Sequence, residues 1–434
     1  MIKLPNLYIL YTIYLKGGIK LDSKFEKVKQ LLDKYGQQQL LVYYDKLSDR
    51  EKEKLLDQIL TLDFELINSL FELTKRPIDL GNDKIEPIEY VEKNKIEPKT
   101  YEELEEKGVK KIKEGKLAIV TMAGGQGTRL GHDGPKGTFD LGLESKKSIF
   151  EILCDKLKEA YNKYKVYITW YLMTSNENNQ STIKFFEENN YFNYPKEKIK
   201  FFIQGELPMI DTAGKVLVDQ SGFVKLAANG HGGVFESMLT SNVLEDLKKD
   251  NIEWIFIGGV DNVLVKMVDP LFIGLAESKN CLAAGKSVVK ANPEEKVGVF
   301  CMRNNKPSVI EYSEITNEMA NQKNQDGQLV YGETHLLCNL FNIQIIEKIS
   351  KNKLPYHVAF KKASYINEKG ELIEPEQPNS YKFETFIFDA FSSIASMAIL
   401  RVKREEEFAP VKNKEGVDSP ETARELYKNF YGIS

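Results

Sequence analysis

Cysteine is scarce in this chain, with four in 434 residues, and no two of them form a Cys-x-x-Cys pair. Structural zinc sites and disulfide frameworks use closely spaced cysteines, so both are disfavoured. Three of the four lie in apolar runs, where free thiols are commonly buried. The four positions are Cys154, Cys281, Cys301 and Cys338. This usage predicts a protein of the reducing cytosol, and so a cytoplasmic location.

An excess of charge of either sign is also missing, since 60 basic residues face 64 acidic ones and the formal net charge is −4. General nucleic-acid and membrane-surface binders carry a marked basic surplus, so neither kind of partner is expected. The apolar run at residues 4–15 is too short to cross a bilayer as a helix, and no small-x-small cleavage site follows it. We expect this run to be an extension that is disordered or packs as a strand.

Glycine, by contrast, is concentrated at one place. The apolar, β-prone run 117–122 leads into a turn that holds Gly124, Gly125 and Gly127. Because these residues lack a Cβ, their backbone N–H groups can approach an anion closely. Arg129 and Lys136 follow, and their charges supplement the backbone dipoles. The segment predicts a phosphate-binding turn, and an ordinary glycine-rich surface loop is the alternative.

Two common nucleotide-binding motifs do not fit this turn. A Walker A loop ends with a lysine directly after a glycine, whereas Lys136 follows Pro135. A dinucleotide-binding Gly-x-Gly-x-x-Gly fingerprint also fails, because Leu130 occupies the place of the third glycine. Kinase-type P-loop and dinucleotide-binding functions are therefore disfavoured.

The sequence G-G-x-G-T-R-L-G at 124–131, followed by P-K-G at 135–137, resembles the signature of nucleotide-sugar pyrophosphorylases. More narrowly, it resembles the eukaryotic UDP-N-acetylglucosamine pyrophosphorylases. Further matching segments lie at 170–175, 204–208, 258–266, 306–307, 309–314 and 404–413. The resemblance implies a Rossmann-like nucleotidyltransferase core. It also implies that UTP and N-acetylglucosamine 1-phosphate react by direct displacement, assisted by Mg²⁺ or Mn²⁺, with release of pyrophosphate.

Four charged residues match the positions of that family's catalytic groups. The resemblance implies that Arg129 contacts the β- and γ-phosphates and that Lys136 meets the charge developing on the α-phosphoryl group. Asp261 is the candidate metal ligand, since Mg²⁺ uses one or two carboxylates together with substrate phosphates. Lys412 matches a C-terminal lysine that reaches back to the substrate phosphates. Taken alone, each lysine or arginine is a solvated charge, and Asp261 is a turn aspartate.

The resemblance also implies contacts to the base and the sugar. The nucleotide-binding set comprises Gly124, Gly125, Gln204 and Gly230. A side-chain amide such as that of Gln204 offers both a donor and an acceptor to the pyrimidine edge. The sugar-binding set comprises His231, Asn262, Gly298, Glu311, Asn339, Phe386 and Phe388. The two phenylalanines are candidates for the wall around an acetyl group, with plain core packing as the alternative.

One segment departs from the family pattern. The N-acetylglucosamine enzymes typically read P-D-G-N-G-G where residues 228–233 read A-N-G-H-G-G. Gly-His-Gly resembles UDP-glucose and broad UDP-sugar pyrophosphorylases, so the same chemistry on glucose 1-phosphate or several sugar phosphates is an alternative function. A nucleotide-sugar binding protein without catalysis is a second alternative. The joint presence of the four charged residues argues against it.

The pattern along the chain predicts an α/β protein with three regions. Capping boxes at Ser23 and Ser48 and an N-cap at Thr100 predict a mainly helical region over 1–110. Over 111–385, apolar runs alternate with helical stretches, which predicts a mainly parallel mixed sheet covered on both faces. The expected strands are 117–122, 166–173, 254–260, 282–289, 297–302 and 336–343. Residues 386–434 are assigned to a small C-terminal domain.

Overall fold

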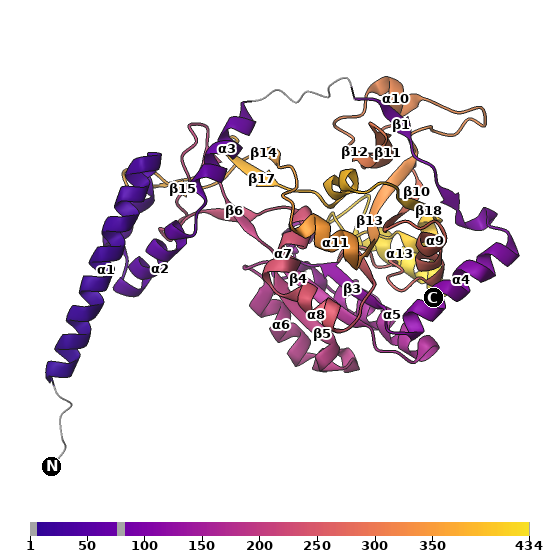
Figure 1. The fold of residues 1–434 in the computed structure, drawn as a ribbon, viewed down its shortest axis with the longest axis horizontal. Helices are drawn as coiled ribbons and strands as arrows, with labels where there is room; N and C mark the ends of the chain where they lie inside the picture. The colour runs from indigo at the N-terminus through magenta and orange to yellow at the C-terminus, as the bar shows by residue number, and fades with distance from the viewer. Residues whose placement is uncertain (1–6, 76–82, 434) are drawn as a thin grey trace, which may run out of the picture. The chain divides into compact units, whose positions relative to one another are not determined.

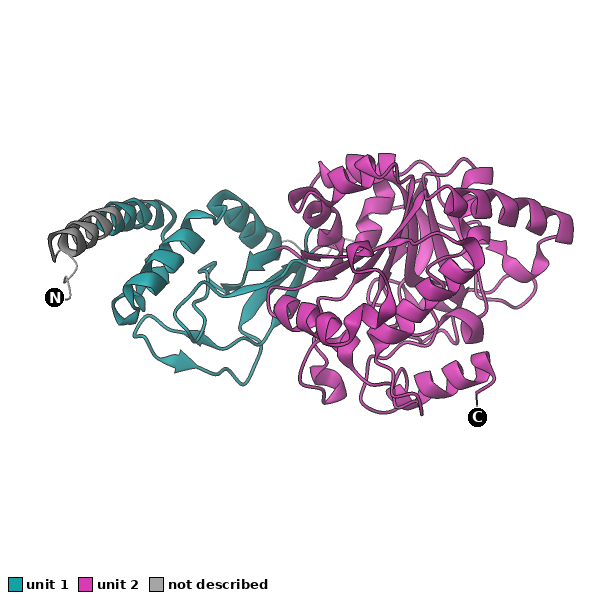
Figure 2. Ribbon diagram, turned by 90° about the horizontal axis from the view of Figure 1, so that it is seen from below, with its two compact units in different colours: residues 1–79, 206–229, 356–384 teal, residues 80–205, 230–355, 385–434 magenta. Residues whose placement is uncertain are grey.

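The computed structural model describes residues 7–75 and 83–433. It forms two compact units (Figure 2), one of residues 1–79, 206–229 and 356–384, the other of residues 80–205, 230–355 and 385–434. Each unit combines segments that are distant in sequence. This division differs from the three predicted regions, because long-range packing joins 386–434 to the central sheet and joins 206–229 and 356–384 to the N-terminal helices.

The first unit packs three helices with small β-structures. Its helices are α1 (Leu7–Tyr35), α2 (Asp49–Leu60) and α3 (Phe64–Thr74). A three-stranded sheet has the order β14 (His357–Lys361), β17 (Ser380–Glu384) and β7 (Ile210–Asp211). Two-stranded pairs join β6 (Glu206–Pro208) to β8 (Leu226–Ala228) and β15 (Tyr365–Ile366) to β16 (Leu372–Ile373). One apolar cluster, including Val28 of α1 and Leu55 of α2, forms its core.

Two predictions for the N-terminal region are corrected here. The described part of the apolar extension is helical, because α1 begins at Leu7. No proline follows Pro5 before the end of α1, so Ser23 lies inside one continuous helix and does not start a new one. The capping box at Ser48 is confirmed, since its backbone N–H donates to the Glu51 carboxylate at 2.9 Å.

The second unit is built on a mixed sheet (Figure 1). Its main path runs in the order β2, β18, β10, β13, β9, β3, β4 and β5. Their bounds are β2 Val91–Glu92, β18 Ala398–Arg401, β10 Ala283–Val289, β13 Glu333–Asn342, β9 Trp254–Gly259, β3 Leu117–Met122, β4 Thr169–Thr174 and β5 Ile199–Ile203. Neighbours are parallel except at β13, which runs antiparallel to β10 and β9. The side strands are β1 Ile85–Pro87, β11 Val299–Arg303 and β12 Lys306–Ile310.

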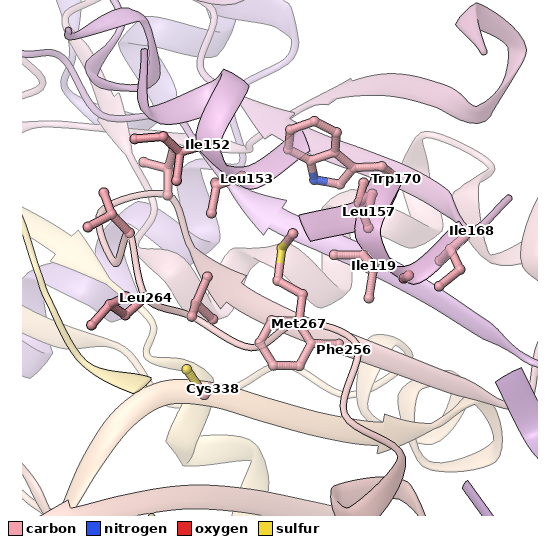
Figure 3. Close-up of a cluster of buried hydrophobic side chains, with 14 of the residues drawn as sticks. Ile119, Ile152, Leu153, Leu157, Ile168, Trp170, Phe256, Leu264, Met267 and Cys338 are labelled. Atoms are coloured by element: carbon pink, nitrogen blue, oxygen red, sulfur yellow. The ribbon is translucent and has the colours of Figure 1, made fainter. Parts of the chain in front are cut away.

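The predicted strands are confirmed, each within about three residues of its expected ends. Helices cover both faces of the sheet, as alternation along β3 illustrates. Ile119 belongs to one apolar cluster, whereas Ala118 and Val120 belong to the other. Figure 3 shows Ile119 in the first cluster beside Leu157 and Trp170.

The helices of the first face are α4 (Pro98–Lys113), α5 (Ile149–Tyr164), α6 (Asn179–Glu188), α9 (Pro270–Ser278) and α13 (Pro420–Tyr431). Those of the second are α7 (Val234–Thr240), α8 (Val243–Lys249) and α11 (Ile343–Ser350). Two short helices, α10 (Asn317–Asn321) and α12 (Arg404–Glu407), lie in connections. α4 begins at Pro98, not at the predicted N-cap Thr100, because proline is preorganised for the first helical position.

The sheet brings two chain segments together at its carboxyl edge. β3 and β9 are parallel neighbours, and their last residues, Met122 and Gly259, stand opposite each other. The glycine-rich turn and the loop holding Asp261 therefore leave the sheet side by side.

None of the helices within residues 7–75 and 83–433 has the length and apolarity needed to cross a membrane.

Candidate functional site

The glycine-rich turn is closed on itself by backbone hydrogen bonds. The Gly127 N–H donates to the Gly134 carbonyl at 2.8 Å, and the Lys136 N–H donates to the Gly125 carbonyl at 3.0 Å. The side chain of Asn178 ties the start of the turn down by donating to the Ala123 carbonyl at 3.0 Å. The turn is therefore a fixed structure that holds Lys136 close to Gly125.

Some amides of the turn are used by the chain itself. Those of Ala123, Gly127 and Leu130 donate to backbone carbonyls. In the described part of the chain, five others have no acceptor, namely those of Gly124, Gly125, Gln126, Thr128 and Arg129. These five N–H groups are the ones available to an anion.

Three of the predicted catalytic residues, Arg129, Asp261 and Lys412, lie within electrostatic reach of the fourth, Lys136. Burial lowers the pKa of the Lys136 ammonium, and the charges of Lys412 and Arg129 lower it further, while Asp261 opposes the shift. Arg129 is exposed, and Lys136, Asp261 and Lys412 are half-buried. The structure thus gathers three cations and one carboxylate from segments almost 300 residues apart.

Lys412 reaches this place because the C-terminal segment pairs with the loop after β9. The Val411 N–H donates to the Asp261 carbonyl at 2.9 Å, and the Val263 N–H donates to the Ala409 carbonyl at 3.1 Å. The Lys412 ammonium lies 3.5 Å from the Asp418 carboxylate. Lys412 therefore stands beside Asp261, with Asp418 as its present ionic partner.

A cavity of about 220 Å³ opens next to these groups. Its wall includes seven of the predicted residues, namely His231, Asp261, Asn262, Gly298, Glu311, Phe388 and Lys412. Polar residues that the sequence analysis did not select also line it, namely Lys296, Thr334 and His335. The Thr334 hydroxyl is buried and has no hydrogen-bond partner among the described residues. The cavity thus joins the charged constellation to most of the predicted sugar-binding set.

The hydrogen bonds of His231 define its state. Its Nδ1 atom accepts from the Ile387 N–H at 3.0 Å, so Nδ1 carries no proton and Nε2 is the protonated nitrogen. The ring stacks on Phe386 at a centroid distance of 5.2 Å and meets Phe388 edge-on at 6.1 Å. The His231 ring therefore has a single N–H, at Nε2, and is held between two aromatic side chains.

A second histidine holds the predicted sugar ligand Asn339. His335 Nε2 lies 3.1 Å from Asn339 Oδ1, and Asn339 Nδ2 has no partner among the described residues although it is fully buried. Burial lowers the pKa of His335 to about 4, so its ring is neutral near pH 7. The backbone N–H of His335 donates to the carbonyl of Gly298 at 2.9 Å. Asn339 itself lies behind the wall, in contact with His335.

A bulge in β13 explains how these residues reach the cavity. Asn339 pairs with Gly285 and His335 pairs with Ser287, so three residues of β13 stand opposite one residue of β10. The middle residue of the bulge, Leu337, lines the cavity and has φ of 55°, which is costly for a branched side chain. Bulges that re-aim side chains are typical beside functional sites.

The predicted uracil contacts also lie together. The Gln204 side-chain amide donates to the Gly230 carbonyl at 2.7 Å. A Cβ added at Gly124 would stand 2.8 Å from Gln204 Oε1, so the amide oxygen faces the backbone of the turn. Gly125, the next residue, is exposed. Only a glycine leaves this approach open.

Asp261 is the carboxylate available for a divalent metal. The described residues contain no group of three or more His, Cys, Asp or Glu side chains that could cage an ion. A single carboxylate beside a phosphate-binding turn still fits Mg²⁺, which takes its remaining ligands from phosphates and water. Mn²⁺ accepts the same oxygen ligands.

A buried ion network connects the C-terminal segment, through Glu407, to Lys286 and Asp269. The Lys286 ammonium, 1% exposed, contacts the Asp269 carboxylate at 2.7 Å and also the Glu407 carboxylate. Burial alone would lower the pKa of Lys286, but Asp269 and Glu407 outweigh burial and raise it. Burial would raise the pKa of Asp269, and the positive charges of Lys286 and Lys266 outweigh it and lower that pKa. Lys286 and Asp269 are therefore both charged in the folded protein.

Comparison with known proteins identifies a family. Residues 64–417 match the family described as UTP–glucose-1-phosphate uridylyltransferase. The chain is similar to UDP-N-acetylglucosamine pyrophosphorylase from Saccharomyces cerevisiae, with 36% identity over 92% of this chain and 88% of that protein. It is also similar to UDP-N-acetylglucosamine diphosphorylase 2 from Arabidopsis thaliana, with 36% identity over 93% of this chain and 83% of that protein.

A solved structure agrees with this comparison. The uridine diphosphate N-acetylglucosamine pyrophosphorylase from Trypanosoma brucei, solved in complex with an inhibitor, has a TM-score of 0.78 and 30% identity. The match covers 93% of this chain and 84% of that one. The Rossmann-like α/β fold expected from the sequence is therefore confirmed.

Proposed function

The chain belongs to the UTP–glucose-1-phosphate uridylyltransferase family, and we propose from this premise that it makes UDP-N-acetylglucosamine. Its substrates are UTP and N-acetylglucosamine 1-phosphate, and its second product is pyrophosphate. The relatives named above as UDP-N-acetylglucosamine pyrophosphorylases and diphosphorylases, at 36% identity over more than nine tenths of the chain, support this choice of sugar.

The reaction is a direct displacement at phosphorus. A phosphate oxygen of the sugar 1-phosphate attacks the α-phosphorus of UTP, a new P–O bond forms, and the bond to the bridging α,β-oxygen breaks with release of pyrophosphate. Both reactants are anions, so the protein must align them and neutralise their charge. No covalent intermediate on the protein is required.

Each cation has a distinct task in this scheme. The free amides of the turn and Arg129 bind the β- and γ-phosphates. Lys136, half-buried and therefore poorly screened by water, stabilises charge on the α-phosphoryl group. Lys412 leaves Asp418 for the substrate phosphates when they arrive. Asp261 would hold Mg²⁺ or Mn²⁺, and the bound ion would supply Lewis-acid stabilisation of charge on the phosphate oxygens.

The base and the sugar lie on either side of this centre. The uracil edge meets Gln204 and the backbone around Gly124 and Gly230. The sugar enters the cavity lined by His231, Gly298 and Glu311, with Asn339 behind its wall. One observation carries the proposal, namely that the three cations and Asp261 converge beside a cavity lined by the predicted sugar ligands.

A second candidate, turnover of glucose 1-phosphate, is favoured by His231. Its ring offers a single donor, which a sugar hydroxyl accepts as readily as an acetyl carbonyl does. The side-chain amide of asparagine, which the family pattern typically has in this place, both donates and accepts. The chain therefore accepts glucose 1-phosphate more readily than an enzyme with asparagine there.

The test measures pyrophosphate released from UTP with N-acetylglucosamine 1-phosphate, N-acetylgalactosamine 1-phosphate and glucose 1-phosphate in parallel. The highest kcat/KM is expected with N-acetylglucosamine 1-phosphate. A higher value with glucose 1-phosphate would transfer the assignment to the second candidate. Binding of UDP-N-acetylglucosamine without any turnover would instead identify a non-catalytic binding protein.

The compartment follows from the cysteines and is part of the same proposal. All four are buried free thiols, and burial raises the pKa of Cys154 and Cys338 to about 12. Such thiols suit the reducing cytosol, where UTP is also available. We propose a cytoplasmic enzyme with small-molecule substrates and no nucleic-acid or membrane partner.

A further inference from the structure

Asn262 lies between two segments that carry catalytic groups. Its side chain is almost fully buried, with 4% exposed. The Nδ2 atom donates to the Glu407 carbonyl at 2.8 Å. The Oδ1 atom accepts from the Ala409 N–H at 2.9 Å and from the Leu264 N–H at 3.2 Å. One carboxamide thus joins the loop after β9 to the C-terminal segment at two points.

These contacts leave little of Asn262 for a sugar. A carboxamide has two acceptor positions and two donor hydrogens, and here both acceptor positions and one hydrogen are used by backbone groups. The resemblance to the family placed Asn262 in the predicted sugar-binding set. Its hydrogen bonds favour a different task.

The backbone pairing between the loop after β9 and the C-terminal segment, which Asn262 joins, ends next to Lys412. Ala409 and Val411 form backbone hydrogen bonds with Val263 and Asp261, and Lys412 is the next residue of the segment. The backbone of Lys412 is therefore fixed in register with that of Asp261. This matters because a lysine side chain is long and flexible, so its ammonium can be placed only if its backbone is placed.

The start of the C-terminal segment, at Glu407, is held by a buried ion pair. Glu407, whose carbonyl receives the Asn262 bond, directs its carboxylate to the buried Lys286, which also binds Asp269. Glu407 is 3% exposed and does not line the cavity. The segment is thus fixed through its backbone by Asn262 and through its side chain by Lys286.

We propose that Asn262 is a positioning residue that sets Lys412 against Asp261, with the Glu407–Lys286 pair as its support, and that it is not a sugar ligand. The inference rests on the proposed function, since it concerns how Lys412 meets the substrate phosphates. Misplacement of a catalytic group by about 1 Å costs on the order of 100-fold in rate. Loss of Asn262 should therefore lower kcat and leave binding of the sugar phosphate unchanged.

The experiment is a double-mutant cycle on the full-length enzyme. The variants are Asn262→Ala, Lys412→Ala and the two combined, each assayed for kcat and for KM of the sugar 1-phosphate. Asn352→Ala is the matched control, because that asparagine also donates to a backbone carbonyl, at 3.1 Å, but is exposed at the end of α11. UTP binding by calorimetry and thermal melting establish that each variant is folded.

We expect Asn262→Ala to lower kcat by about 10- to 100-fold, with KM for the sugar 1-phosphate within twofold of wild type. In the Lys412→Ala background the same change should cost less than threefold, since there is no ammonium left to place. The inference would be overturned if Asn262→Ala lowered kcat by the same factor in the wild-type and Lys412→Ala enzymes. A rise in KM together with a changed preference among sugars would also overturn it. The asparagine would then be a sugar ligand or a general structural group.

A second variant keeps the test decisive if Asn262→Ala does not fold. Glu407→Gln preserves the shape of the side chain and leaves the Lys286–Asp269 pair intact. We expect Glu407→Gln alone to give a smaller fall in kcat with an unchanged KM, and to cause no further loss of kcat when it is added to Lys412→Ala. A wild-type protein without turnover would refute the proposed function before any variant is compared. An additive cycle in an active enzyme would refute this inference alone.

Discussion

Replacement of Lys136 tests the central claim about charge at the reacting phosphorus. This ammonium is half-buried, its pKa is lowered mainly by burial, and the cations Lys412 and Arg129 lower it further. A desolvated charge acts on a phosphoryl group with less screening than a surface lysine does. Removal of one such electrostatic group from an active site costs about 10²- to 10³-fold in kcat, or ~2.7–4 kcal/mol. We therefore expect Lys136→Ala to reduce kcat by that factor.

The pH dependence gives the same prediction a second readout. Because the pKa of Lys136 is lowered, the protonated form is lost at a lower pH than for a free lysine. The alkaline limb of kcat/KM should then fall below the usual lysine pKa of about 10.4. Lys136→Arg, whose charge persists at high pH, should move this limb upward even if its rate is lower.

The assay is pyrophosphate release from pH 6 to pH 10.5, with both substrates saturating for kcat and with N-acetylglucosamine 1-phosphate below its KM for kcat/KM. Lys351→Ala is the control, because this exposed lysine pairs with Glu347 on α11 and is not part of the cavity wall. Activity of Lys136→Ala within a few-fold of wild type would refute the assigned role. An alkaline limb unchanged in Lys136→Arg would show that another group titrates there.

Three further outcomes follow from the structure. EDTA should abolish turnover and Mg²⁺ should restore it, while Asp261→Asn should need more Mg²⁺ and lose at least tenfold in kcat, as a titration of rate against metal will show. His231→Asn should raise the kcat/KM ratio of N-acetylglucosamine 1-phosphate over glucose 1-phosphate by about tenfold, measured with both substrates. Gly108→Ala should destabilise the protein by about 2–3 kcal/mol in urea unfolding, because its Cβ would collide with the Pro270 carbonyl where α4 crosses α9. Lys110→Ala, on the exposed side of the same helix, should change stability by less than about 0.5 kcal/mol.

The strands were predictable because their signal is local. β3 has its predicted bounds, since its apolar run ends at a cluster of glycines, which weaken a strand. Helix starts were less predictable. The capping box predicted at Ser23 is a pattern of only four residues. It does not start a helix there, because the longer cooperative helix α1 begins at Leu7 and includes Ser23.

In the candidate site too, some residues were predictable from local sequence and others were not. The turn with Arg129 and Lys136 could be read from one short segment, because its glycines and cations are adjacent in sequence. His335 could not, since it reaches the cavity wall only through the bulge at Leu337, and positive φ in a leucine leaves no trace in the sequence pattern. A histidine in an apolar strand is ordinarily a core residue, which is why it was not selected.

Asn262 illustrates how a motif can identify a residue without fixing its role. The motif shows only that a residue with a side-chain amide follows Asp261. That amide could bind a ligand or could hold two backbone segments together. The distinction depends on Ala409 and Glu407, more than 140 residues later, whose backbone groups use that amide. Such pairing is non-local, and Glu407 of the same segment also binds the buried Lys286. The placement of Lys412 is therefore a property of the folded sheet edge and of the segment clamped to it, which no single stretch of sequence contains.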